Sequence, residues 1–467
     1  MKFKLTVTDP KQTHFILDKA NADFSHNQIA LNAVIGTLVK YGLSGRLEPY
    51  LAESWSVTQD KKNWQFIIRP NLHCEDGTLI TAQLIKDNLL QSLKEYSHRK
   101  SSVIMFDHLL GWNDFIEGKT SELVGLSTND NILKLQFDEN PDDLLELLRM
   151  PYFGLWREKD HKIISSGPYT IKTVANNAVT LELRRKWFTS NDDSFKEVEI
   201  SFVGFDEINK EVAASSIVRM PAFTNVNQEQ KDGFWITSPP TVLESFVLSP
   251  FKNNFFNDLE NRKIFKARVS SLYPDLVKSV FFYPSARTDG LSPTEDLTYK
   301  NISNVSKLTF SLERMAYSEE ELLNLKKIIG YALEGSKVEF EIIPRDPKDK
   351  EWFAKSLSNN HFDARMAVVD IGAYPIYTAI KMMFCTKLGI NFPDQTHQMC
   401  ELVTDGIKSA KAIDQEFVDK FNNILNEESV VIPIKHYSGK WLVANNLDPE
   451  SIPSTTLYPQ FDLIRTR

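Results

Sequence analysis

The sequence has little cysteine, no long apolar run and no excess of positive charge, and each of these shortages excludes a class of protein. Its three cysteines are too few for a disulfide framework. No apolar run approaches the roughly 18 residues that a membrane-spanning helix needs. The 54 Lys and Arg are outnumbered by 62 Asp and Glu, so the net charge of −8 argues against a nucleic-acid-binding protein.

The cysteines Cys74, Cys385 and Cys400 leave two arrangements open. One is a single bridge between Cys385 and Cys400. The simpler expectation is three buried thiols, because unpaired cysteine packs as a small hydrophobic residue.

Sequence motifs of the common enzyme classes are also absent. The chain contains no Gly-x-Ser-x-Gly turn, no His-Glu-x-x-His helix and no Gly-x-Gly-x-x-Gly loop. The densest group of metal-ligand residue types is His73–Asp76. Neighbours on a strand point to opposite faces, so these residues cannot all reach one ion. We therefore predict neither catalysis nor a bound metal or cofactor.

The composition that remains is that of a globular protein with several domains. A length of 467 residues suggests about three domains at roughly 150 residues each. Hydrophobic residues make up 42% of the chain and aromatic residues 11%, which is enough to fill sizeable cores. The charged fraction of 25% is ordinary for globular domains, so extended disorder is excluded.

Helix and strand patterns alternate along the chain, which predicts an α/β fold. The clearest helix lies at 318–333, where Ser318 and Glu321 form a capping box and Gly335 is placed to end the helix. Further helices are predicted at 81–95 and 413–425, a hairpin at 122–137, and strands at 169–174, 179–183, 198–203, 338–342 and 430–434.

The most specific pattern covers residues 47–85, where two strands joined by a polar turn lead through a tight turn into a helix. Its characteristic positions are Leu47, Pro49, Leu51, Ala52, Ser54, Trp55, Val57, Asp60, Phe66, Arg69, Asp76, Gly77, Thr78, Thr81 and Ala82. In this order and without a gap they resemble the signature of the family-5 extracellular solute-binding proteins, the oligopeptide-, dipeptide- and nickel-binding components of ABC importers. Ser166–Tyr169, Phe256–Ile264 and Val431–Ile434 resemble later motifs of that family in the same order.

The resemblance implies an α/β, two-lobed periplasmic-binding-protein-like fold of the class II type with an extra domain, and a ligand cleft between the lobes. The lobes would close about the ligand by hinge motion near residues 236–246 and 436–446. Domain I would be discontinuous. The implied division is domain I in residues 1–36, 161–240 and 443–467, domain II in 37–160 and domain III in 241–442.

The resemblance also indicates where domain III would bind a ligand. Peptide-binding members carry an Asp, which pairs with the α-ammonium of the peptide, in a segment that this chain matches at Arg365–Pro375. Here that position holds Ile371 and the acidic Asp370 stands one place earlier, a departure that weakens the case for free peptide N-termini. We take Asp370, Arg365 and Tyr374 as candidate ligand-binding residues. An ion pair between Asp370 and Arg365 is the structural alternative.

Four more candidate ligand-binding residues come from other parts of the implied cleft. Tyr437 follows the strand at 430–434, where peptide binders place a pocket tyrosine, and Trp441 lies nearby in the sequence. Packing around the hinge is an equal alternative for both aromatic residues. In domain I the loop Asn21–Asn27 is where family members approach the ligand, so Asn21 and Asn27 complete the set.

The expected function is that of the solute-binding component of a bacterial ABC importer for peptides or a related small solute. Its expected partners are the ligand and a membrane permease, not nucleic acid, and the protein is expected to be a monomer in the periplasm or outside the cell. Lys4–Asp9 resembles the first strand of mature family members, so a signal sequence is expected to have been removed. The alternative is the ligand-sensing domain of a transcription regulator with the same fold, and an enzyme on this scaffold ranks last.

Overall fold

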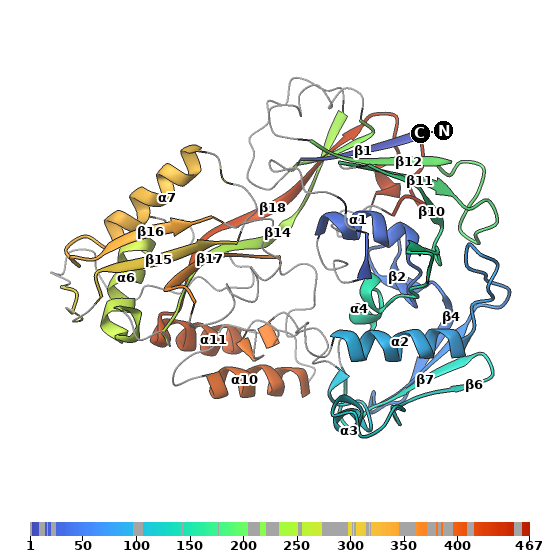
Figure 1. The fold of residues 1–467 in the computed structure, drawn as a ribbon, viewed down its shortest axis with the longest axis horizontal. Coiled ribbons are helices and arrows are strands. Elements are labelled where there is room, and N and C mark those ends of the chain that lie inside the picture. The colour runs from blue at the N-terminus through green and yellow to red at the C-terminus, as the bar shows by residue number, and fades with distance from the viewer. Residues whose placement is uncertain are drawn as a thin grey trace. The chain divides into compact units, whose positions relative to one another are not determined.

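Two long strands, β14 (Gly233–Leu248) and β18 (Val431–Ala444), carry the chain between the two units into which it divides (Figure 1). Unit 1 comprises Met1–Pro239 and Gly439–Arg467, and unit 2 comprises Pro240–Ser438. The structure is a computed structural model that describes residues 2–8, 15, 17–19, 25–96, 106–141, 144–175, 177–203, 215–220, 233–250, 255–272, 298–300, 302, 305–313, 317, 319–344, 361–370, 380–381, 384–385, 396–408, 415–452 and 460–467. The finer division into three domains stays a prediction.

The main sheet of unit 1 joins strands that lie far apart in the sequence. Its strands are β1 (Lys2–Thr8), β10 (Tyr169–Val174), β11 (Ala178–Leu183), β12 (Glu197–Val203) and β13 (Ile217–Met220). Their order is β10-β11-β12-β1-β13, and the last part of β18 pairs with β13. β1 runs parallel to β12 and β13, whereas β10, β11 and β12 form an antiparallel meander.

A second, antiparallel sheet in unit 1 contains the strands of the motif at 47–85. These strands are β4 (Ala52–Val57), β5 (Asn63–Ile68), β6 (Leu126–Asn129) and β7 (Ile132–Gln136), in the order β4-β5-β7-β6. Trp55 lies opposite Phe66, and Val57 lies opposite Trp64, as the alternating pattern predicts. Helix α2 (Ala82–Tyr96) packs on β6 and β7.

The other elements of unit 1 are shorter. They are α1 (Ser25–Val34), β2 (Val39–Tyr41), β3 (Leu47–Pro49), α3 (Trp112–Ile116), α4 (Leu144–Leu148), η3 (Pro151–Phe153), β8 (Glu158–Lys159), β9 (Lys162–Ile163) and η8 (Pro449–Ser451). None of the helices that the structure describes, in either unit, is long and apolar enough to cross a membrane.

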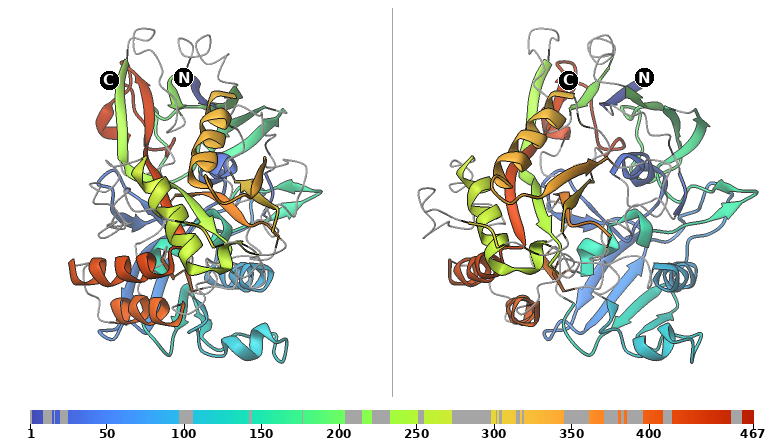
Figure 2. Two further views of the ribbon diagram at one scale, coloured as in Figure 1. Left: turned by 90° about the vertical axis from the view of Figure 1, so that its left-hand side faces the viewer. Right: turned by 60° about the vertical axis from the view of Figure 1, so that its left-hand side comes forward.

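Unit 2 is a sheet with a hydrophobic core on each face. Its strands are β14, β15 (Lys307–Leu312), β16 (Glu339–Ile343), β17 (Ala364–Asp370) and the first part of β18, in the order β18-β14-β17-β15-β16. Phe246 and Met366 belong to one core, and their neighbours Val247 and Ala367 belong to the other. The first core also holds η5 (Phe255–Asn257), α6 (Leu259–Ser271) and α7 (Glu319–Ala332). The second holds α10 (Thr396–Lys408) and α11 (Gln415–Glu428), which lie side by side in Figure 2.

The predicted helices and strands are confirmed, with differences of a few residues at their ends. The helix expected at 81–95 is α2, and the Oγ1 of Thr81 caps it by accepting the N–H of Leu84 at 3.1 Å. The helix expected at 318–333 is α7, and Gly335 follows it with a φ of 77°, the left-handed conformation that ends a helix. Ser318 of the predicted capping box lies outside the described residues. The strand expected at 430–434 is longer, because β18 continues past unit 2 to pair with β13.

The expectation of three free thiols is wrong for two of the cysteines. Cys385 and Cys400 form a disulfide, with their Cα atoms 5.5 Å apart, whereas Cys74 is free and buried as expected. The pair meets because its neighbours Phe384 and Met399 are buried in the same core of unit 2. Packing of residues distant in the sequence thus decides the pairing, and composition alone does not reveal it.

Removal of this disulfide should destabilise unit 2. The bridge closes a loop between residues 15 apart in the sequence, and a loop of that size stabilises a fold by about 3 kcal/mol through the unfolded chain. In urea, the double variant C385S/C400S should unfold at lower denaturant concentration than the wild type. Reductant should lower the midpoint of the wild type to that of the variant and leave the variant unchanged. A wild-type midpoint that does not move after the thiols are shown to be reduced would refute this.

Candidate functional site

The carboxyl ends of two parallel strands lie toward one edge of the unit 2 sheet, and ligands of open α/β sheets bind at such edges. β15 and β17 are parallel neighbours, with Leu312 aligned to Met366. β14 is antiparallel to β17, so Val242 lies opposite Asp370, the last residue of β17. The part of β14 that enters unit 2 therefore begins at the edge where β17 ends.

β18 brings a further predicted residue toward the same edge. It begins beside the far end of β14, where the backbone N–H of Leu248 donates to the carbonyl oxygen of Val430. Because β14 and β18 are hydrogen-bonded neighbours, β18 then runs back toward the edge marked by Asp370. Tyr437 lies on this stretch of β18, within unit 2. The side chains of Asp370 and Tyr437 lie outside the described residues, so the strand order places the positions only.

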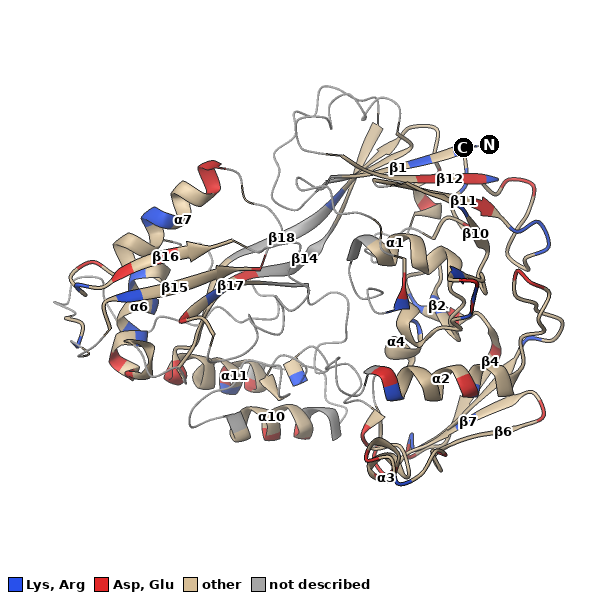
Figure 3. Cartoon of the chain, viewed as in Figure 1, with Lys and Arg blue, Asp and Glu red and all other residues tan. Residues whose placement is uncertain are grey.

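Arg365 already has a carboxylate partner in unit 2. Its Nη1 lies 3.0 Å from Oε1 of Glu313, and each side chain is only 10% exposed. Figure 3 shows acidic and basic residues close together along β14, β15 and β17. Because the pair is buried, Glu313 neutralises the guanidinium and holds it against the sheet.

Two acidic residues of this region were not among the predicted site residues. Glu313 follows β15 directly, and Glu244 lies in β14, where its Oε1 accepts a hydrogen bond from the hydroxyl of Tyr317 at 3.1 Å. Both carboxylates are largely buried. Glu244 interrupts the run Val242–Leu248, which is otherwise mostly apolar. Since charged residues are rarely buried without a partner, an acidic residue inside an apolar strand is the signal that would have found it.

The remaining predicted residues lie in unit 1 or outside the description. Asn27 is buried in α1, and Trp441 is buried in β18 opposite Arg219 of β13. Asn21 and Tyr374 lie outside the described residues. Burial of Trp441 agrees with the packing interpretation of this residue, and ligand contact by Asn27 or Trp441 stays a prediction.

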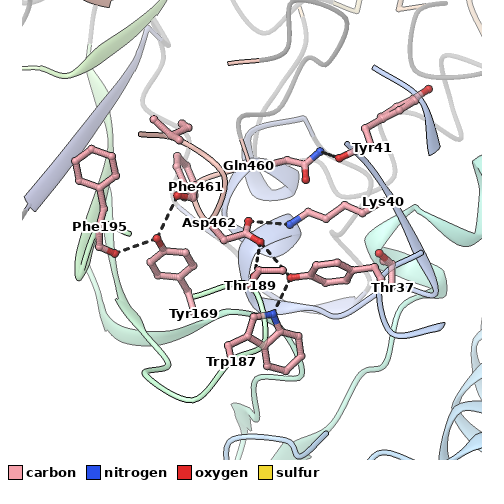
Figure 4. Close-up of polar contacts among 12 residues, drawn as sticks. Thr37, Lys40, Tyr41, Tyr169, Trp187, Thr189, Phe195, Gln460, Phe461 and Asp462 are labelled. Atoms are coloured by element: carbon pink, nitrogen blue, oxygen red, sulfur yellow. Dashed lines mark hydrogen bonds and ion pairs between the residues drawn. The ribbon is translucent and has the colours of Figure 1, made fainter. Parts of the chain in front are cut away.

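Unit 1 holds a different buried polar cluster, centred on Asp462 (Figure 4). The Asp462 side chain is 1% exposed, and its Oδ1 lies 3.0 Å from Nζ of Lys40. The hydroxyls of Thr189 and Tyr50 donate to Oδ2 at 2.9 and 3.4 Å. The Tyr50 oxygen in turn accepts the indole N–H of Trp187 at 3.0 Å. Both carboxylate oxygens are thus used within the protein, so the cluster is a structural junction.

The same junction fixes the backbone around Asp462. The hydroxyl of Tyr169 donates to the carbonyl oxygen of Phe195 at 3.0 Å and lies 3.4 Å from that of Phe461. Gln460 donates from its side-chain amide to the carbonyl oxygen of Tyr41 (Figure 4). Burial raises the pKa of Tyr169 far above the ordinary tyrosine value, so its hydroxyl stays a hydrogen-bond donor. The residues after 460 are in this way tied to the rest of unit 1.

The cluster His73–Asp76 holds a turn. The Asp76 carboxylate accepts the N–H of Thr78 at 3.1 Å and pairs with Arg157 at 3.2 Å. Glu75 exchanges hydrogen bonds with the segment at 165. Burial raises the pKa of the Cys74 thiol, which disfavours the thiolate that a metal would need. Among the described residues no group of three or more His, Cys, Asp and Glu suits a metal ion.

Comparison with known proteins confirms the resemblance seen at 47–85. Residues 46–265 match the sequence model of the bacterial extracellular solute-binding proteins, family 5 Middle. A putative binding protein of Haemophilus influenzae is 25% identical over 199 residues, which is 41% of this chain and 37% of that protein. The periplasmic oligopeptide-binding protein OppA of Escherichia coli is 28% identical over 236 residues, which is 47% of this chain and 42% of OppA. The aligned part thus spans less than half of either relative.

The predicted fold is confirmed over a greater length. The murein tripeptide binding protein MppA of Escherichia coli has a TM-score of 0.76 to this chain at 16% identity. The match covers 100% of this chain and 98% of MppA. At this level of identity the match shows the shared α/β periplasmic-binding fold.

Substitution of Asp462 should destabilise unit 1 strongly. Asp462→Asn removes the charge that compensates the Lys40 ammonium, and breaking a buried pair costs about 3–5 kcal/mol. The free energy of unfolding, measured in urea, should fall by that amount. The control is Asp193→Asn, because Asp193 is exposed, and surface changes of this kind stay within about 0.5 kcal/mol. If the two variants were equally stable, the junction would not hold unit 1 together.

Proposed function

We propose that this chain, which resembles the family-5 extracellular solute-binding proteins in sequence and shares their fold, is the solute-binding component of a bacterial ABC importer. Its ligand would be a peptide or a related small solute. The observation that carries the proposal is the ungapped signature between Leu47 and Ala82, set in a fold matched over the whole chain. Similar proteins named for oligopeptide and murein tripeptide binding support the peptide class.

The domain division implied by the resemblance is part of the proposal. Domain I takes residues 1–36, 161–240 and 443–467, domain II takes 37–160 and domain III takes 241–442. The two observed units support this scheme, because the chain passes between them after Pro239 and again after Ser438. We propose that β14 and β18 act as the hinge at these two points, and that a ligand shifts the equilibrium toward the closed form.

The proposed ligand contacts in unit 2 are Asp370 at the end of β17, Tyr374 in the segment that follows, and Tyr437 of β18. Arg365, near the start of β17, is the fourth proposed contact and lies away from the carboxyl edge. The strand order supports the placement of Asp370 and Tyr437, because it brings the end of β17 and the middle of β18 toward one edge. Asn21, Asn27 and Trp441 are the proposed contacts from unit 1.

The proposed setting is the periplasm or the outside of the cell, with a membrane permease as the partner, a monomeric protein and no catalysis. The disulfide between Cys385 and Cys400 supports an oxidising compartment, since such bonds are rare in the reducing cytoplasm. The family matched in residues 46–265 is one of binding proteins. No observation favours the regulator, so it is not carried further.

Mass spectrometry of the small molecules that copurify with the protein tests the function directly. The expected result is a stoichiometric ligand, a peptide or a peptide-like solute, released when the protein is denatured under conditions that keep the disulfide. A protein that carries no small molecule and binds none from a pooled peptide mixture would refute the function.

Variants at the edge of the unit 2 sheet test the proposed contacts. Tyr437→Ala and Asp370→Asn should each weaken binding of that ligand at least tenfold, about 1.4 kcal/mol, because a direct contact is lost. Thermal unfolding should change little in Asp370→Asn, and calorimetric titration measures the affinity. Glu401→Gln, at an exposed position of α10, is the matched control and should bind as the wild type does. Unchanged affinity in both edge variants would place the ligand elsewhere.

A further inference from the structure

Helices α6 and α11 of unit 2 meet through two buried cations. Arg262 and Lys266 lie four residues apart on α6, so they share one face of the helix. They are only 3% and 6% exposed, respectively. Two cations this deeply buried need opposite charges or hydrogen-bond acceptors from the elements packed against them, to offset their lost hydration.

Arg262 receives that compensation from the end of α11. Its Nε donates to the carbonyl oxygen of Glu428 at 2.8 Å, and its Nη2 lies 3.5 Å from the Glu428 carboxylate. Its Nη1 donates to the carbonyl oxygen of Phe256 at 2.9 Å. The Glu428 side chain is itself buried, so this is a charge pair shielded from water.

Lys266 receives no such charge. Its Nζ donates to Oδ1 of Asn426 at 2.7 Å, and no carboxylate lies within ion-pair distance of it in the described parts of the chain. One turn earlier on α11, Oδ1 of Asn422 is buried without a hydrogen-bond partner. Among the described residues, the acceptor of the Lys266 amine is thus a neutral amide oxygen, to which a neutral amine can donate without bringing in charge.

The N-cap of α6 and the next charged residue along the helix after Lys266 have other partners. Asp258 caps the helix and pairs with Lys300 at 3.0 Å. The Arg268 guanidinium lies over the ring of Tyr299, 5.1 Å from its centre. Burial alone lowers the pKa of the Lys266 ammonium, to about 7, with no opposing charge to raise it.

The contact between α6 and α11 lies at the end of α11, just before β18 begins. α11 ends at Glu428, Ser429 adopts a φ of 51°, and β18 begins at Val431. We propose that the α6–α11 contact is a pH-sensitive joint: the Lys266 amine is uncharged in the folded unit in alkaline solution, and as the pH falls to neutral the contact loses stability, so that α11 and the start of β18 are held less firmly. This device does not depend on the proposed ligand.

The sign of the pH dependence follows from the two states of the lysine. In the unfolded chain the ammonium has its ordinary pKa of 10.5, and in the folded unit the value is about 7. Between these values the unfolded chain binds the extra proton, so Lys266 costs stability at neutral pH and this cost disappears as the pH rises toward 10.5. Within the window, the contribution of one lysine changes the unfolding constant up to tenfold for each pH unit.

Urea unfolding of the full chain from pH 6.5 to 10 tests the joint by comparing variants at each pH. The ratio of the unfolding constant of the wild type to that of Lys266→Met should fall about tenfold per unit from pH 7.5 upward. Lys263→Met is the matched control, because the Lys263 side chain lies on the same helix, is 36% exposed and pairs with Glu260. Its ratio should not change with pH. Lys266→Gln replaces Lys266→Met if the latter fails to fold.

A second variant supplies the missing charge. Asn426→Asp places a carboxylate at the Lys266 amine, so the lysine should stay charged in the folded unit. The pH-dependent difference from Lys266→Met should then disappear. Amide hydrogen exchange of α11, corrected for intrinsic rates, should show lower protection at pH 6 than at pH 8 in the wild type and not in Lys266→Met. The proposal would be overturned if the ratio of the wild-type unfolding constant to that of Lys266→Met did not change with pH, as is expected for Lys263→Met.

Discussion

Two neighbouring strands, β14 and β18, make every covalent connection between the two units, and this constraint shapes the whole fold. Because the chain leaves unit 1 after Pro239 and returns at Gly439, unit 1 is built from sequence-distant parts. β13 has β1 on one side and the returning end of β18 on the other. Unit 1 is therefore complete only when the residues that come after unit 2 in the sequence, 439–467, have packed onto it. The same two strands are the proposed hinge.

Buried charge is placed where distant segments must meet. Asp462 ties the returning chain to the elements around Lys40, and the pair of Arg262 and Glu428 joins α6 to the end of α11. Burying the two charges of each pair costs desolvation free energy, which is offset only when the charges meet each other. Each pair therefore favours the arrangement of the joined segments in which its two charges are in contact. Lys266 differs, since the acceptor that its amine has among the described residues is the neutral side chain of Asn426. We propose that the charge of this buried amine depends on pH.

Local patterns in the sequence predicted the elements, and the family signature predicted the fold. Helices such as α7 carry their own start and stop signals, and the hairpin of β4 and β5 follows from simple alternation. What sequence reasoning missed depends on contacts between distant residues. The Cys385–Cys400 bond needs α10 packed in the second core, and the pairing of Arg365 with Glu313 needs β15 beside β17. The proposed ligand residues share this difficulty, because β17 and β18 reach one edge only through the order of the sheet.

The proposed function requires that the chain close about a small solute. Small-angle scattering of the purified protein, first stripped of bound molecules and then saturated with the copurifying ligand, measures this directly. We expect a single particle whose radius of gyration decreases when ligand is added. A scattering profile that stays unchanged at saturating ligand would contradict closure about β14 and β18.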